Sequence, residues 1–102
     1  MNAQDLYRMK VALKKARERL GPIKARKVEE RQDRMPSWDE FNLTNQFDKL
    51  TEEEIIELED AYTAFMADPR PYRLDKLLEE IADCINVLEG IAYQAMKEIG
   101  EV

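Results

Sequence analysis

The sequence predicts an all-α fold, a bundle of three or four helices within one domain spanning residues 1–102. Hydrophobic residues make up 44% of the chain and charged residues 37%, with only three glycines and four prolines, a balance typical of amphipathic helices. Apolar side chains recur at spacings of three and four residues, and no segment sustains the alternation of a strand. A chain of this length forms one domain with a modest core.

The first helix is expected over residues 2–20. One stripe of this segment carries its apolar side chains: Leu6, Met9, Leu13, Ala16 and Leu20. Gly21 and Pro22 are expected to break or kink the helix. A short basic helix should follow over residues 22–33, because proline suits the first turn of a helix.

A second long helix is expected over residues 37–67. Ser37 should cap its N-terminus, because Glu40 follows three residues later, as a capping box requires. Thr51 and Glu54 have the same spacing, so a kink or restart is expected near the middle of this helix.

The last helix is expected over residues 72–99. The two prolines within residues 68–71 should end the preceding helix. Gly100 is a natural stop for the last helix, since glycine is favoured just beyond a helix C-terminus.

Charge is divided unevenly along the chain. Residues 1–35 contain eleven Lys and Arg against five Asp and Glu, whereas residues 36–102 contain five against seventeen. The simplest interpretation is that a basic helix packs against an acidic remainder. A basic arm that attracts phosphates is a second interpretation. Nucleic-acid binding is disfavoured, because the acidic remainder would repel the phosphates.

The cysteine and histidine content limits the kinds of site that this chain can form. Cys84 is the only cysteine, so an intrachain disulfide is impossible and a cytoplasmic location is expected. No apolar run approaches the roughly 18 residues of a membrane span, and the N-terminus has no signal-peptide pattern. The chain has no histidine. Metal binding must therefore depend on carboxylates, which favour a hard cation such as Mg²⁺ or Mn²⁺.

Four acidic residues fall on or beside apolar helix faces when each helix is projected at about 100° per residue. In the second long helix, the apolar arc contains Phe47, Leu50, Ile55, Leu58, Ala61, Tyr62 and Phe65. Glu54 falls inside this arc and Glu57 at its edge. In the last helix, Glu80 and Asp83 flank the corresponding arc.

Burying an unpaired carboxylate is costly, and each of these pairs has i, i+3 spacing, which places both members on one face. If the two helices pack antiparallel, the four carboxylates converge, and a divalent cation would neutralise them. A solvated acidic surface is the simpler alternative, because acidic residues also favour helix N-termini.

The same residues form a two-part motif. Glu53-Glu54-Ile55-Ile56-Glu57 is followed after 22 residues by Glu80-Ile81-Ala82-Asp83, which reads EExxE and then ExxD. This pattern resembles the all-α nucleoside triphosphate pyrophosphohydrolases, the MazG-like superfamily, over about residues 36–99. The family also includes dimeric dUTPases and phosphoribosyl-ATP pyrophosphohydrolase. Trp38-Asp39 lies at a similar distance upstream, but Asn42-Leu43-Thr44 departs from the polar residues that follow in the family.

The resemblance implies a metal site and an activity. It assigns Mg²⁺, with Mn²⁺ as a possible substitute, to four ligands: Glu54, Glu57, Glu80 and Asp83. It implies cleavage of a nucleoside triphosphate into a monophosphate and pyrophosphate. Glu53 would orient or deprotonate the attacking water, although a solvated glutamate is the simpler interpretation.

The resemblance also suggests substrate contacts and assembly. Trp38 would stack on the base, Asn86 would hydrogen-bond the nucleotide and Lys49 would contact a phosphate; a packing role for Trp38 and an exposed Asn86 remain alternatives. The other cations in the acidic part are Arg70, Arg73, Lys76 and Lys97. Family members share helices between subunits, so a homodimer or homotetramer is expected. Alternative functions are a dUTP- or dCTP-selective pyrophosphatase and a non-enzymatic helical adaptor of the phage type.

Overall fold

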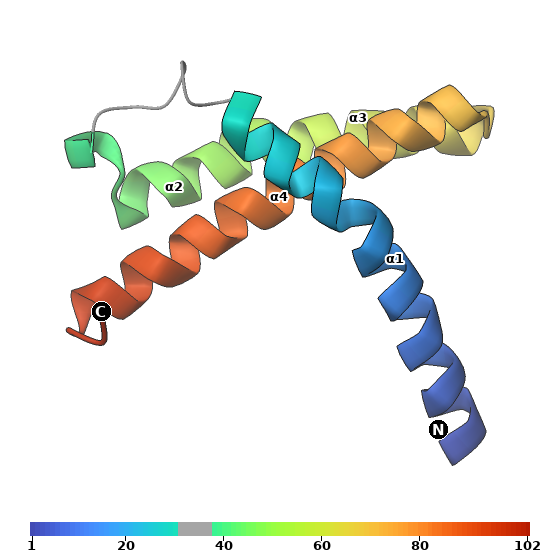
Figure 1. The fold of residues 1–102 in the computed structure, drawn as a ribbon. Helices are drawn as coiled ribbons and strands as arrows, with labels where there is room; N and C mark the ends of the chain where they lie inside the picture. The colour runs from blue at the N-terminus through green and yellow to red at the C-terminus, as the bar shows by residue number, and fades with distance from the viewer. Residues whose placement is uncertain (31–37) are drawn as a thin grey trace.

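The computed structural model describes residues 1–30 and 38–102, without the side chain of Asp39, and every regular element in these residues is helical (Figure 1). The elements are α1 (Ala3–Glu30), a short 3₁₀ helix η2 (Trp38–Glu40), α2 (Leu43–Lys49), a π-helical turn η3 (Leu50–Glu54), α3 (Ile55–Ala67) and α4 (Pro71–Glu98). The predicted all-α fold is confirmed. Within these residues, no helix has both the length and the apolar character needed to cross a bilayer.

A break or a kink was predicted at Gly21 and Pro22; helix α1 is one uninterrupted element, so the break and the separate basic helix after it are wrong. Pro22 cannot donate a hydrogen bond to the carbonyl of Glu18, but the neighbouring bonds of this 28-residue helix continue through it. Figure 1 shows the ribbon curving through this region without interruption. At the other end, Asn2 caps the helix, because its Oδ1 accepts a hydrogen bond from the Asp5 amide at 2.8 Å.

The helix predicted over residues 37–67 begins at Leu43, later than expected. Asn42 is its N-cap: the side chain accepts a hydrogen bond from the Asn45 amide at 2.9 Å. The predicted cap, Ser37, and the predicted end of the basic helix at residue 33 lie outside the described residues.

The irregularity expected near the middle of this helix is present, but it is not a restart. The hydroxyl of Thr51 donates to the carbonyls of Phe47 and Asp48 at 3.2 and 3.3 Å, so Thr51 does not form a capping box. The chain instead passes through the π turn η3, closed by a hydrogen bond from the Ile55 amide to the Leu50 carbonyl.

The π turn changes which residues of α2 face inward. A π turn contains about one residue more than an α turn, which rotates α2 by roughly 100° relative to a continuous α-helix. Gln46 is therefore buried on the same side as Glu54, and Phe47 is 54% exposed. The prediction that Phe47 belongs to the buried arc is wrong for this reason.

Helix α4 runs antiparallel to the α2–η3–α3 run and packs along its length (Figure 1). The predicted boundaries agree to within one residue: α3 ends at Ala67 as expected, α4 spans Pro71–Glu98 instead of residues 72–99, and Gly100 follows it with a φ of +75°. A left-handed residue at this position suits glycine. The antiparallel pairing brings the acidic motif of the run opposite the acidic motif of α4.

The second half of α1 crosses another face of α4. Ala82 is fully buried there, and its small side chain allows close approach. Around it, ion pairs join the two helices: Arg19 to Asp75 at 3.1 Å, Arg26 to Glu79 at 2.8 Å, and Lys24 to Glu89. The interpretation that the basic helix packs against the acidic remainder is confirmed for this half of α1.

The interior is small and largely polar. The buried apolar residues of the described chain are Ala61, Ala82, Cys84 and Val87. The buried polar and charged residues are Gln46, Glu54, Glu80, Asp83 and Gln94. The interface between α4 and the α2–η3–α3 run is thus centred on carboxylates, and these need a specific explanation.

Candidate metal centre

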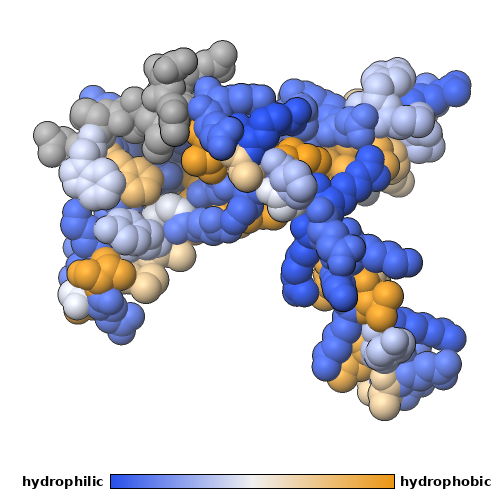
Figure 2. All heavy atoms as spheres, viewed as in Figure 1, coloured by the Kyte–Doolittle hydropathy of each residue, from blue (hydrophilic) through white to orange (hydrophobic). Residues whose placement is uncertain are grey.

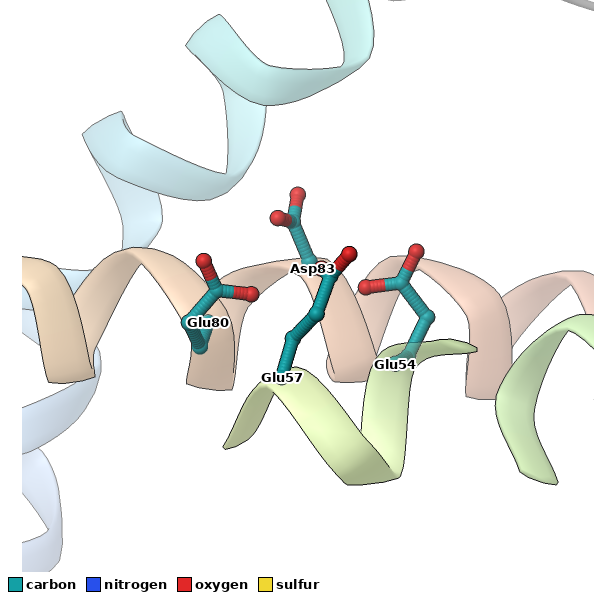
Figure 3. Close-up of side chains that lie close together, drawn as sticks. All are labelled: Glu54, Glu57, Glu80 and Asp83. Carbon is teal, nitrogen blue, oxygen red and sulfur yellow. The ribbon is translucent and has the colours of Figure 1, made fainter. Parts of the chain in front are cut away.

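Four carboxylates converge between α4 and the run that contains η3 and α3 (Figure 3). Glu54 and Glu57 project from one helix, and Glu80 and Asp83 project toward them from the other. One oxygen from each side chain lies within 4.8 Å of the others. Glu54, Glu80 and Asp83 are only 2%, 3% and 3% exposed. The convergence predicted from helical periodicity is therefore present.

Local structure fixes the position of Glu54. It is the last residue of η3, so the π turn determines its orientation toward α4. The thiol of Cys84, on α4, donates to the main-chain carbonyl of Glu54 at 3.6 Å. This contact links the backbone of the turn to the helix that carries Glu80 and Asp83.

The surroundings of Glu57 disfavour the charged form of its carboxyl group. Burial, followed by the charges of Glu54 and Glu80, raises the pKa of Glu57 above its ordinary value. Burial also raises the pKa of the Cys84 thiol, with Glu54 contributing next. Carboxylates this close repel one another, so ionisation of all four requires nearby positive charge.

Three lysines, each from a different helix, supply part of that charge. Lys27 of α1 lies 3.6 Å from Asp83, Lys49 of α2 lies 3.7 Å from Glu54, and Lys76 of α4 lies 2.7 Å from Glu80. The hydrogen bond to Glu80 is the main cause of the raised pKa of Lys76. The first two distances exceed those of close hydrogen bonds, so these two lysines flank the carboxylates at the edge of the cluster.

The three lysines leave open space beside the four carboxylates. A groove of about 1070 Å³ lies beside the four acids. Its described lining includes the three lysines together with Phe41, Asn45, Gln46, Val87 and Gly90. Ligand oxygens around Mg²⁺, bound at about 2.1 Å, lie roughly 3–4 Å apart. A small inward movement of the carboxylates would achieve this spacing, so the acidic cluster could hold a divalent cation with water completing its coordination.

The other predicted site residues divide between the groove and its surroundings. Lys49 and Asn86 line the groove. The amide nitrogen of Asn86 donates to the carbonyl of Lys24 at 3.1 Å, so this side chain also holds α1 on α4. Glu53 lies at the rim of the groove, 3.5 Å from Lys49, with an exposed side chain outside the four-acid cluster.

Trp38 lies outside the described lining of the groove. Its ring packs against Phe41, with centroids 5.7 Å apart, and the Lys97 ammonium lies 5.5 Å from the Trp38 ring centroid. Phe41 does line the groove. In this arrangement Trp38 supports an aromatic ring of the groove.

The remaining candidate phosphate ligands have other partners. Arg70 pairs with Asp68 at 3.0 Å, and Arg73 donates to the carbonyl of Ala64 at 2.7 Å. Of the cations considered from the sequence, Lys49 and Lys76 are therefore the ones that line the groove.

Lys27 is the charged residue beside the four acids that the sequence analysis missed, and Phe41, Asn45, Gln46 and Gly90 of the groove lining were not predicted either. Lys27 lies seven residues after Leu20, so it continues the apolar stripe of α1 as a charged residue. A charge on an apolar stripe is the signal that identified the four acids. Applied to α1, the same criterion would have selected Lys27.

Comparison with known protein families, with curated proteins and with solved structures finds no match for this chain. The interpretation of the site therefore depends on its geometry and on the motif that carries it.

The geometry predicts stabilisation by divalent cations. Mg²⁺ or Mn²⁺ at about 100 times its Kd should stabilise the fold by about 2.7 kcal/mol, which raises the melting temperature by roughly 10 °C in a domain of this size. Differential scanning fluorimetry would measure this rise. NaCl at matched ionic strength is the control, and an equal rise with NaCl would show that the effect is only screening of repulsion.

Proposed function

We propose that this protein is a Mg²⁺-dependent nucleoside triphosphate pyrophosphohydrolase of the MazG-like type, which releases a nucleoside monophosphate and pyrophosphate. The observation that carries the proposal is the convergence of four carboxylates within 4.8 Å. The EExxE and ExxD motifs select the same four residues by resemblance. Two separate lines of reasoning thus lead to one set of ligands.

Glu54, Glu57, Glu80 and Asp83 would hold the metal. Mg²⁺, when bound, neutralises charge on the phosphoryl oxygens and makes a nearby water a better nucleophile. Once a cation neutralises the acids, Lys27, Lys49 and Lys76 lose much of their attraction to them. Their long side chains can then turn into the groove and bind the phosphates of the substrate.

The rest of the groove suits the remainder of a nucleotide. Phe41 offers an aromatic ring for stacking, and the amides of Asn45 and Gln46 offer hydrogen bonds to a base edge. Gly90 leaves space beside them, because a Cβ at this position would meet Gln46. Glu53, at the groove rim, is the candidate to accept a proton from the attacking water.

Product analysis tests the proposal directly. Incubation with a panel of NTPs and dNTPs and Mg²⁺ should yield monophosphate and pyrophosphate in equal amounts, and EDTA should stop the reaction. Relative rates across the panel would also show whether dUTP or dCTP is preferred. Release of orthophosphate instead would contradict the proposed bond cleavage.

A non-enzymatic role is the second candidate, and the lysine contacts favour it. Because Lys27, Lys49 and Lys76 each lie beside one of the buried acids, the cluster could be a structural ion-pair network in an adaptor protein. This alternative predicts no turnover of any nucleotide and no stabilisation by Mg²⁺ beyond that of NaCl.

A further inference from the structure

The first half of α1, residues 3–18, extends away from the rest of the molecule as an arm (Figure 1). One stripe of the arm is apolar and consists of Leu6, Met9, Leu13 and Ala16. Leu6 is 47% exposed and Leu13 is 51% exposed. Figure 2 shows hydrophobic side chains on the arm between hydrophilic ones. The arm therefore presents an apolar face that its own chain leaves uncovered.

The same stripe is covered where α1 reaches α4. Leu20 and Ile23 continue it at heptad spacing, and both are partly buried in the part of α1 that packs on α4. The exposed stripe is thus the continuation of an existing packing surface. Lys10 and Arg17 lie along one edge of the exposed part, and the arm contains five Lys and Arg against two Asp and Glu.

The outer face of α3 has an apolar stripe and an acidic edge, which complement the apolar stripe and basic edge of the arm. Ile55, Tyr62 and Met66 form an exposed apolar stripe on this face, at positions i, i+7 and i+11; Tyr62 is 55% exposed and Met66 is 61% exposed. Glu52 and Glu59 lie beside the stripe and are exposed. Residues 51–67 contain six acidic residues and neither Lys nor Arg. This surface is apolar along its centre and acidic at its edge.

We propose that the arm of one chain docks on the outer face of η3 and α3 of a second copy of this chain, with the two copies exchanging arms reciprocally. Apolar stripes would cover each other, and Lys10 and Arg17 would face acidic residues. The lengths also agree: sixteen residues of arm span about 24 Å, and residues 50–67 span about 27 Å. Reciprocal exchange gives a closed dimer.

Charge and geometry disfavour the other occupants. Pairing two arms would bring two positively charged helices together. Nucleic acid would use the basic residues but leave the apolar stripe uncovered. Docking of an arm on its own α3 is prevented, because α1 is continuous and carries the arm away from the body.

The oligomeric state of the full chain, measured without nucleotide, tests this proposal independently of the proposed activity. Sedimentation velocity should give a mass twice the 12.0 kDa of the chain. The double substitution Leu6→Gln and Leu13→Gln should raise the dimer dissociation constant by at least about 100-fold. Val11→Gln is the matched control, because Val11 is exposed on the opposite side of the arm and should leave the dimer unchanged.

Mixing two variants identifies the docking surface. Tyr62→Gln with Met66→Gln should weaken the dimer as the arm substitutions do, while circular dichroism shows an unchanged helical fold. A mixture of the arm variant and the α3 variant should form a heterodimer, since one intact arm then meets one intact α3. A monomeric wild type, a dimer that survives the arm substitutions, or a mixture that stays monomeric would each overturn the proposal. A salt-sensitive complex with duplex DNA, formed by a monomeric wild type, would assign the arm to nucleic acid instead.

Discussion

Glu54→Gln is expected to lower pyrophosphate release by at least about a thousandfold and to remove the Mg²⁺-dependent rise in melting temperature. The substitution keeps the shape of a side chain that is 2% exposed but removes one charge from the proposed metal site. Loss of metal-ion stabilisation of the transition state costs several kcal/mol, and each 1.36 kcal/mol is tenfold in rate. Steady-state kinetics and scanning fluorimetry would measure both effects.

The same substitution should stabilise the metal-free protein by on the order of 1 kcal/mol, because it removes a buried carboxylate from a cluster of like charges. Lys49, which lies 3.7 Å from Glu54, keeps Glu53 as a partner. Asp60→Asn is the matched control: this acid lies exposed on α3, six residues after Glu54, and should change neither activity nor metal response. An equal loss of activity in Asp60→Asn would show that the effect is not specific to the four acids. Unfolding of Glu54→Gln would show that these acids are structural.

Gly90→Ala and Gly21→Ala are each expected to change stability by less than about 1 kcal/mol and to differ in their effect on nucleotide binding. A Cβ at Gly90 would lie 2.8 Å from the Oε1 of Gln46 and 3.4 Å from the ring of Phe41. Gln46 Oε1 is the far end of a flexible side chain that lines the groove, so it can shift, and this shift offsets part of the gain of up to about 1 kcal/mol from better helix propensity. At Gly21 no atom beyond its chain neighbours lies within 4 Å, but a Cβ there would crowd the ring of Pro22, which again offsets part of that gain.

Urea unfolding monitored by circular dichroism would measure both changes. Gly90→Ala should also raise KM for the nucleotide, because Phe41 and Gln46 must shift within the groove, whereas Gly21→Ala should leave KM unchanged. An unchanged KM for Gly90→Ala would contradict the close packing around Gly90.

The sequence was sufficient for the features that depend on local chemistry. Pro71 and Gly100 mark the ends of α4 because the ring of one and the left-handed backbone of the other restrict where a helix can begin or stop. The four acids were found because a charge on an apolar face is costly unless it is neutralised, and this cost is independent of the detailed packing.

The remaining features depend on geometry that periodicity does not contain. A helical projection assumes about 100° per residue throughout. It could not anticipate the π turn, which buries Gln46 and leaves Phe47 exposed. Gly21 and Pro22 were expected to break or kink the helix, yet one missing hydrogen bond is tolerated within 28 residues whose second half is anchored by ion pairs. Lys27 enters the groove through the crossing of α1 over α4, a tertiary contact between residues far apart in sequence.

The continuity of α1 has a mechanical consequence. One stiff rod carries the outward arm at one end and Lys27 near the other, with the contact on α4 between them. Because the helix between them is continuous, a force that tilts the arm would also move the Lys27 ammonium group beside Asp83. A partner that binds the arm would thereby change the electrostatic field at the four carboxylates.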